Sequence, residues 1–287
     1  MKSWAKISVA VLLTAMICVP VTATVMGTES YTLNVAGSTT VQPLMAELQK
    51  EFEKFANVKM YVTGGGSGVG ISSTVNGISD IGMLSRDLKE SEKEGLDEHH
   101  IAKDAVVVIV NASAGVDDVS LEDLAKIYSG ELTNWNQVKN GDGTGTHEYG
   151  NNVNIAVMAR EEGSGTRDCF ETALKTADKN FKMKERDVNA VNSTGAVLSA
   201  VETTPGAIGY INLNVSDNLP EKITKVKVDG VDAVSETILD GSYEISRDLI
   251  LVTNGAPAGM TKFFIDWVMS EEGQNIVERS GFVRIDG

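Results

Sequence analysis

The chain has 287 residues, of which 42% are hydrophobic, and its formal net charge is −15 at pH 7. This length is enough for two ordinary domains with a sizeable core. The negative charge argues against nucleic acid and anionic membrane surfaces as partners. It leaves a small anion possible as a ligand, because salt screens exposed charges beyond ~10 Å and local donors dominate inside a closed cleft.

The first 23 residues have the pattern of a secretory signal peptide. Lys2 and Lys6 precede an apolar run over residues 7–19, and Val21-Thr22-Ala23 offers a cleavage site. The apolar run is too short to cross a bilayer comfortably. We therefore expect an exported protein, periplasmic or extracellular and associated with the cell surface. Loss of the two lysines would change the net charge from −15 to about −17.

The two cysteines do not predict a disulfide. Cys18 lies in the signal segment and follows Ile17, where a lipidation signal has a small residue, so we expect no lipid on it. Cys169 would then be the single cysteine of the mature chain. We interpret it as a small buried residue on a helix.

Strand and helix patterns alternate along the rest of the chain, which predicts α/β architecture with helices covering the sheets. Strands are expected at residues 31–36, 57–62, 79–84, 104–110, 153–158, 207–211, 222–228 and 247–252. Helices are expected at 41–55, 68–77, 120–128, 164–176, 194–203, 261–269 and 271–279. Residues 140–152 are interpreted as a surface loop that lacks the acidic ligands of a calcium site. No metal site and no cofactor are expected.

Three strand-to-helix junctions are rich in glycine and hydroxyl residues. They are Ala-Gly-Ser-Thr-Thr at 36–40, Gly-Gly-Gly-Ser-Gly-Val-Gly at 64–70 and Arg-Glu-Glu-Gly-Ser-Gly-Thr-Arg at 160–167. A helix start presents unpaired N–H groups and the positive end of its dipole, and Ser and Thr add hydroxyl donors. Glycine lets the backbone approach a ligand closely. Together the three junctions predict one site for a tetrahedral anion.

Arg160 ends an expected strand directly before Gly-Ser-Gly-Thr. This context favours an anion clamp over an ordinary surface ion pair, because a guanidinium can bind two oxygens at once. Glu161 or Glu162 is expected to orient it. Arg167 is interpreted as a surface or ion-pair residue. The hydroxyls at 38–40, and likewise that of Ser67, also suit helix caps, a role that is compatible with ligand binding.

The chain resembles the substrate-binding proteins of phosphate ABC transporters, the PstS type. The resembling blocks are AGSTTVQPL (36–44), GGGSGVGI (64–71), DIGMLSRDL (80–88), LEDLAKIYSGELTNWNQV (121–138), AREEGSGTRDCF (159–170), PGAIGYINL (205–213) and ISRDLILVTNG (245–255). They occur in order along nearly all of the chain after residue 30.

The resemblance implies a type II periplasmic binding protein, with two lobes of mixed sheet joined by a two-strand hinge. The chain would leave the first lobe near residues 110–113 and return near 242–245, and the C-terminal helices would pack on the first lobe. The expected division is 1–23 signal peptide, 31–112 plus 244–287 lobe I and 113–243 lobe II. Closure of the cleft would turn binding into a change of shape.

The resemblance and the junctions together predict a phosphate site. Its residues would be Ser38, Thr39, Thr40, Ser67, Ser85, Arg160, Ser164, Gly165 and Thr166, with Arg86, Asp87, Glu161 and Asn192 as further candidates. Asn192 belongs to Asn-Ser-Thr-Gly at 192–195, which either closes the site or simply caps a helix.

Ser85 stands where many phosphate-binding proteins have an aspartate that accepts the proton of hydrogen phosphate. Such a carboxylate rejects sulfate, which has no proton to share. Either Asp87 or another carboxylate takes over this role, or selectivity is looser. Sulfate, molybdate or a phosphonate therefore remains an alternative ligand.

The sequence does not favour an enzyme. His99 and His100 lie in a charged, turn-like stretch and His147 in the expected loop, and no serine forms a Gly-x-Ser-x-Gly elbow. The glycine run also lacks the ending of a P-loop. An extracellular phosphoester hydrolase remains a second alternative. The expected partners are inorganic phosphate and the membrane permease of an ABC importer, with a monomeric protein.

Overall fold

The structure is a computed structural model that describes residues 30–139, 150–185 and 188–285. Its strands are β1 (Tyr31–Gly37), β2 (Val58–Gly64), β3 (Ile81–Leu84), β4 (Leu96–Asn111), β5 (Asp118–Val119), β6 (Ala156–Arg160), β7 (Val188–Val191), β8 (Ala207–Asn212), β9 (Ile223–Val228) and β10 (Ser246–Asn254). Its helices are α1 (Gln42–Phe52), α2 (Ser67–Val75), α3 (Leu121–Tyr128), α4 (Gly165–Ala177), α5 (Thr194–Thr203), α6 (Ser235–Leu239), α7 (Gly259–Val268) and α8 (Glu271–Arg279). The expected signal peptide, His147 and most of the expected loop at 140–152 lie outside the described residues.

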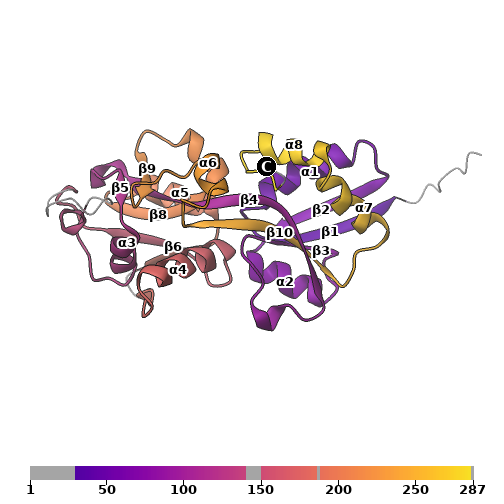
Figure 1. Cartoon of the computed structure of the whole chain (residues 1–287), viewed down its shortest axis with the longest axis horizontal. Coiled ribbons are helices and arrows are strands. Elements are labelled where there is room, and N and C mark those ends of the chain that lie inside the picture. Colours follow the sequence, from indigo (N-terminus) through magenta and orange to yellow (C-terminus); the bar gives the residue numbers. More distant parts are fainter. Residues whose placement is uncertain (1–29, 140–149, 186–187, 286–287) are drawn as a thin grey trace, which may run out of the picture.

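Two lobes lie side by side and are joined by two long strands, β4 and β10 (Figure 1). The first lobe contains β1 to β3 with α1, α2, α7 and α8, and the second contains β5 to β9 with α3 to α6. The strand order is β2-β1-β3-β10-β4-β8-β6-β7, and β9 pairs with β4 and β5. Parallel and antiparallel pairs both occur, so the expected mixed-sheet α/β fold is confirmed.

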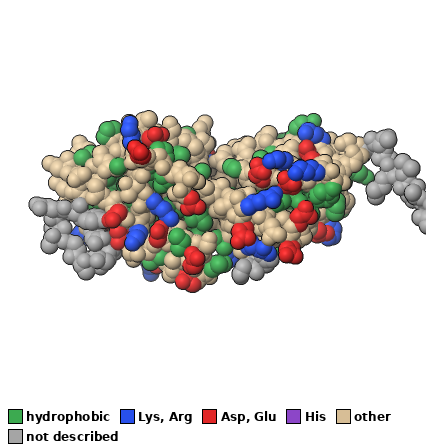
Figure 2. Space-filling model, turned by 90° about the horizontal axis from the view of Figure 1, so that it is seen from above, with side chains coloured by type: hydrophobic (Ala, Val, Ile, Leu, Met, Phe, Trp, Pro, Cys, Tyr) green, Lys and Arg blue, Asp and Glu red, His purple; other side chains and the backbone are tan. Residues whose placement is uncertain are grey.

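Surface charge is mixed. Figure 2 shows Lys, Arg, Asp and Glu side chains interspersed over both lobes on the face that it displays. Neither sign of charge dominates this face. Within the described ranges, none of the helices combines the length and the apolar character needed to cross a bilayer.

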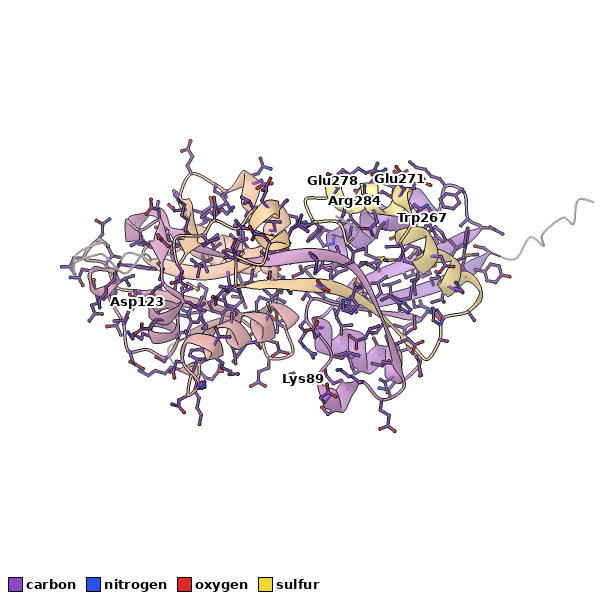
Figure 3. All side chains as sticks on the ribbon, viewed as in Figure 1. Lys89, Asp123, Trp267, Glu271, Glu278 and Arg284 are labelled. Carbon is purple, nitrogen blue, oxygen red and sulfur yellow. The ribbon has the colours of Figure 1, made fainter. Side chains whose placement is uncertain are left out.

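Each lobe has its own buried apolar core. In the first lobe, Phe52 packs edge-on against Phe264, with ring centroids 5.0 Å apart. This contact joins α1 to α7. Figure 3 shows that Trp267 and Glu278 of the C-terminal helices lie on the first lobe, far from Asp123 in the second. Two separate cores allow the lobes to move as two units.

The strands that join the lobes change partners along their length. Residues 96–105 of β4 pair with β10, and residues 106–111 pair with β8 and β9. β4 therefore passes from one lobe to the other between Ala105 and Val106. The expected boundary at residues 112 and 113 lies just beyond the end of this strand, and the division into 31–112 plus 244–287 and 113–243 remains a prediction.

One expectation about local structure is wrong. His99 and His100 lie inside β4, which begins at Leu96, and not in a turn. This half of β4 pairs with β10 and, at Lys103, with Val283, and it is partly exposed, so it lacks the apolar run that identifies a buried strand. The short strands β5 and β7 were also missed, because neither is long enough to show a period.

Candidate functional site

Six buried hydroxyl groups gather where the two lobes face each other, five of them at helix starts and the sixth, Ser85, directly after β3. Each belongs to a residue that is at most 2% exposed. We call this set the hydroxyl cluster; its members are Ser38, Thr40, Ser67, Ser85, Ser164 and Thr166. Buried hydroxyls must be hydrogen-bonded or be kept for a ligand, because an unpaired one is costly.

The three serine hydroxyls of the first lobe form a chain, with Ser85 between Ser38 and Ser67. The Ser38 Oγ donates to the Ser85 Oγ at 2.9 Å, and the oxygens of Ser67 and Ser85 are 3.4 Å apart. The Ser85 N–H donates to the Ser67 Oγ at 3.1 Å. The Thr39 Oγ1 is buried without a hydrogen-bond partner among the described residues. The junction therefore holds at least one polar group in reserve for a ligand.

The helix starts beside these hydroxyls differ in how they are capped. Val41, which precedes α1, provides no side-chain cap, but the Ser38 Oγ accepts from the Thr40 N–H at 3.2 Å and the Ser38 carbonyl accepts from the Gln42 N–H at 3.0 Å, so Ser38 caps the turn that leads into α1. α2 begins after Gly66, whose φ of 89° suits a residue without a Cβ. α4 is capped by Ser164, whose Oγ accepts from the Arg167 N–H. All three leave further backbone N–H groups at their starts.

The two lobes contact each other at the hydroxyl cluster. The oxygens of Thr40 and Thr166 are 3.0 Å apart, and the Gly68 N–H donates to the Gly163 carbonyl at 3.0 Å. A Cβ atom built on Gly165 would overlap the Ser67 Oγ and lie 2.7 Å from the Ser85 Oγ. Gly165 therefore lets α4 approach the first lobe, and the structure shows the lobes closed.

Arg160 is at the end of β6 and is 1% exposed. Its Nε and Nη2 donate to the two carboxylate oxygens of Glu161 at 2.8 Å each, and its Nη1 donates to the Thr194 Oγ1 at 3.3 Å. A guanidinium has five N–H donors, so two of them have no partner among the residues that the structure describes. Of the two glutamates that the sequence offered, Glu161 is the one that orients the arginine.

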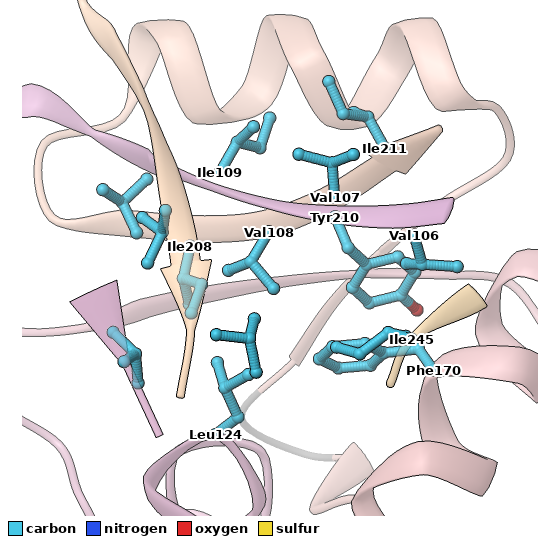
Figure 4. Close-up of a cluster of buried hydrophobic side chains, with 14 of the residues drawn as sticks. Val106, Val107, Val108, Ile109, Leu124, Phe170, Ile208, Tyr210, Ile211 and Ile245 are labelled. Atoms are coloured by element: carbon cyan, nitrogen blue, oxygen red, sulfur yellow. The ribbon is translucent and has the colours of Figure 1, made fainter. Parts of the chain in front are cut away.

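The core of the second lobe positions the Arg160 backbone. The Arg160 N–H donates to the Tyr210 hydroxyl at 3.0 Å, and the Tyr210 ring stacks on Phe170 with centroids 4.3 Å apart (Figure 4). Burial raises the pKa of Tyr210 well above its usual range, so the hydroxyl stays neutral. Arg167 is buried rather than on the surface; it pairs with Glu171 and donates to the Arg160 carbonyl.

Two of the further candidates lie at the surface. Asp87 and Asn192 are both exposed. The hydroxyl in this stretch that reaches Arg160 is that of Thr194, while Ser193 caps α5. Sequence reasoning missed Thr194 because any of the polar residues at 192–195 could have faced the site.

Arg86 is buried, but its N–H donors bind carboxylate groups of the protein. Its Nε is 2.7 Å from Asp168 of α4, and its other nitrogens bind Glu92 at 2.7 and 2.9 Å. Lys89 is 3.2 Å from the same Asp168. These pairs join the lobes beside a cavity of about 600 Å³ that is also lined by Asp87 and Cys169.

The structure also brings a buried ion pair to the hydroxyl cluster that sequence reasoning did not assign. Arg247 of β10 binds Asp104 of β4, and its Nη2 is 3.5 Å from the Thr40 Oγ1. Asp104 and Arg247 are 143 positions apart in the sequence. The block that contains Arg247 had been noted in the sequence, but nothing in it predicted the partner.

The other reactive groups lie outside the hydroxyl cluster. Burial raises the pKa of the Cys169 thiol to about 11, so the protonated form predominates at neutral pH. His99 lies beside Thr253 and His100 beside Asp248. In the described part of the chain, no group of three or more His, Cys, Asp or Glu residues is arranged to hold a metal ion.

The fold and the site define a two-lobed binding protein that encloses a small anion between its lobes. Residues 22–272 match the model of the PBP superfamily domain. The chain is 35% identical to the phosphate-binding protein PstS of Borreliella burgdorferi, over 88% of this chain and 90% of that protein. It is 31% identical to PstS of Bacillus subtilis, over 89% and 81%. The chain belongs to the PstS family of phosphate-binding proteins.

Solved structures of phosphate-binding proteins have the same fold as this chain. A putative phosphate ABC transporter substrate-binding protein from Clostridium perfringens, with bound phosphate, superposes with a TM-score of 0.77 at 36% identity, over 88% of this chain and 99% of that one. An ABC-type phosphate transport receptor from Vibrio cholerae superposes with a TM-score of 0.70 at 29% identity, over 88% and 99%. The expected fold and the resemblance to the PstS type are both confirmed.

Proposed function

We propose that this protein captures inorganic phosphate between its lobes and delivers it to an ABC-type importer. The observation that carries the proposal is the closure of both lobes on one set of donors. The hydroxyl cluster, three helix starts and Arg160 converge there, and all of these side chains are buried. The names of the relatives, which include a structure with bound phosphate, support the same ligand.

The donors suit an anion that has lost its water. Hydroxyl and backbone N–H groups replace the hydration shell with fixed dipoles, which are strong in a closed, low-dielectric site. Arg160 supplies charge, and Glu161 holds its fork before the ligand arrives. An anion that binds donors from both lobes stabilises the closed form, which the permease can recognise by its shape.

Titration calorimetry tests the proposal. The protein is unfolded and refolded to remove co-purified anion and is then titrated with phosphate and, separately, with sulfate. We expect micromolar or tighter binding of phosphate, equivalent to about −8 kcal/mol or better. Absence of binding to either anion would contradict the proposed function.

Ser85 gives the second candidate function, binding of another tetrahedral oxyanion. A carboxylate is absent at this position, and Asp87 is exposed. The Ser85 Oγ accepts from Ser38 and can itself donate, so it suits a fully deprotonated anion as well as hydrogen phosphate. Competition of sulfate, molybdate and a phosphonate against phosphate separates these ligands.

We further propose that the protein is exported, stays near the cell surface, acts as a monomer and binds without catalysis. The signal-like segment at 1–23 supports export, and the phosphate-binding names of the relatives support binding without catalysis. Turnover of a chromogenic phosphate ester that is abolished by Ser164→Ala would contradict the claim that the protein is not an enzyme.

A further inference from the structure

A buried ion pair lies where the two connecting strands cross between the lobes. Asp104 of β4 and Arg247 of β10 are register partners, and their side chains are 0% and 3% exposed. The Nε and Nη2 of Arg247 donate to the same oxygen, Oδ2 of Asp104, at 3.0 and 2.7 Å. The Asp104 Oδ1 accepts from the Leu213 N–H of the second lobe at 3.0 Å. The pair is therefore anchored to the backbone behind the site.

The pair continues into the hydroxyl cluster. Arg247 Nη2 is 3.5 Å from the Thr40 Oγ1, which is 3.0 Å from the Thr166 Oγ1. The guanidinium is thus on the side of the pair that faces the hydroxyls, with the carboxylate behind it. The Nη1 atom of Arg247 is buried and has no hydrogen-bond partner within the described ranges. Two N–H donors of a buried cation are therefore unused beside a site that is rich in other donors.

We propose that Arg247 is a second arginine of the anion site, held in position by Asp104. It orients the Thr40 hydroxyl so that its hydrogen points to the enclosed anion, and it adds positive charge at the end of the site nearest the connecting strands. The inference rests on the proposed function, because it needs an anion in the hydroxyl cluster.

A purely structural role for the Asp104–Arg247 pair explains its unpaired donors less well than a role in anion binding does. A buried pair is weak evidence of a contribution to stability, because desolvation of both charges offsets their attraction. Leaving the Nη1 donors unpaired adds a further desolvation cost. Burial raises the pKa of Asp104, and the Arg247 charge and the hydrogen bonds to Asp104 oppose this shift. An anion that accepts from Thr40 and lies near Nη1 would complete the donor set.

The test replaces the pair by neutral groups of similar shape. Arg247→Gln alone would leave the Asp104 carboxylate buried and unpaired and could prevent folding. The double variant D104N/R247Q avoids this, since the two amides can bind each other. The matched control is K103Q/D248N, which neutralises the ion pair at the neighbouring register position of the same two strands, where the side chains are 36% and 25% exposed. Melting of the anion-free protein reports folding, and calorimetry reports phosphate affinity.

Phosphate is titrated at a mildly alkaline pH, where it is mainly a dianion, and at a mildly acidic pH, where it is mainly a monoanion. We expect D104N/R247Q to bind phosphate at least about tenfold more weakly at alkaline pH, with a smaller loss at acidic pH, because a positive charge stabilises a dianion more than a monoanion. The control should stay within about twofold of the unsubstituted protein at both values.

Two results would overturn the inference. One is affinity of the folded double variant within about threefold of the unsubstituted protein. The other is an equal loss at both pH values, which would indicate only a structural role for the pair. Failure of the proposed function looks different, because the unsubstituted protein would then show no phosphate binding; that result would overturn both.

Discussion

Arg160 and Arg86 are both buried arginines at the interface of the lobes, but they are used in opposite ways. Arg160 takes its partners, Glu161 and Thr194, from its own lobe and keeps two N–H donors without a partner in the part of the chain that the structure describes. Arg86 binds Glu92 of its own lobe and Asp168 of the other. Arg160 is therefore organised before the lobes close, whereas the Arg86–Asp168 pair depends on closure. Both arginines are buried, so burial does not tell their roles apart. Their partners do: those of Arg160 fit a role in ligand binding, and those of Arg86 fit a role in closure of the lobes.

The largest expected effect is that of Arg160→Ala. It removes the charged donor from the hydroxyl cluster and should weaken phosphate binding by ~2–5 kcal/mol, the usual loss when one partner of a buried charge pair is truncated. Calorimetry measures the change. Arg86→Ala is the matched variant and should lose much less. If Arg160→Ala keeps its affinity within about threefold, the site assignment is wrong.

Gly165→Ala should block closure without removing a donor. Its Cβ would overlap the Ser67 hydroxyl, and overpacking of this kind costs ~1–3 kcal/mol. We expect weaker phosphate binding with an unchanged melting temperature of the anion-free protein, because in the open form the helix has room. Gly195→Ala is the control, since a Cβ there meets nothing within 4 Å. Equal affinities of the two variants would contradict the closed geometry.

Ser85→Asp should sharpen selectivity. The new carboxylate would accept the proton of hydrogen phosphate but would face sulfate without a shared hydrogen, which costs sulfate ~1–3 kcal/mol as an unsatisfied buried group. The ratio of the two dissociation constants, measured by competition, should move toward phosphate. An unchanged ratio would show that Ser85 does not contact the anion.

A smaller effect is expected of Asp168→Asn. It weakens the contact that Arg86 makes across the lobes, but Glu92 still binds the guanidinium, so the loss should be ~0.2–1 kcal/mol. Stopped-flow measurements should show faster phosphate release and an unchanged association rate. Lys89→Gln, at a side chain that is 59% exposed, should change the phosphate affinity and the release rate less than Asp168→Asn does. A slower association rate would place the Arg86–Asp168 pair on the path of entry instead.

The sequence predicted those parts of the site that a local pattern of residues is enough to identify. Glycine and hydroxyl residues between a strand and a helix identify an anion-binding helix start, so residues 36–40, 64–70 and 160–167 could be named before the fold was known. Most strands and helices followed from the same periodicities, whereas β5, β7 and α6 did not. Here the local signal and the tertiary role coincide.

Other features depend on contacts that no local pattern encodes. The choice of Glu161 over Glu162 depends on side-chain direction at the end of β6. The meeting of Asp104 and Arg247 depends on strand register across 143 residues. β4 starts earlier than expected, because its charged first half is stabilised by pairing with β10 and not by an apolar run. In each case tertiary context overrides the local signal.

The position of the bound anion tests the account most directly. Crystals of the stripped protein grown with arsenate, a tetrahedral analogue of phosphate, would locate it by the anomalous signal of arsenic. We predict one peak, with arsenate oxygens within hydrogen-bond distance of the hydroxyl cluster and of Arg160. A peak only in the cavity beside Arg86, or no peak from crystals of the closed form, would contradict the assignment of the site.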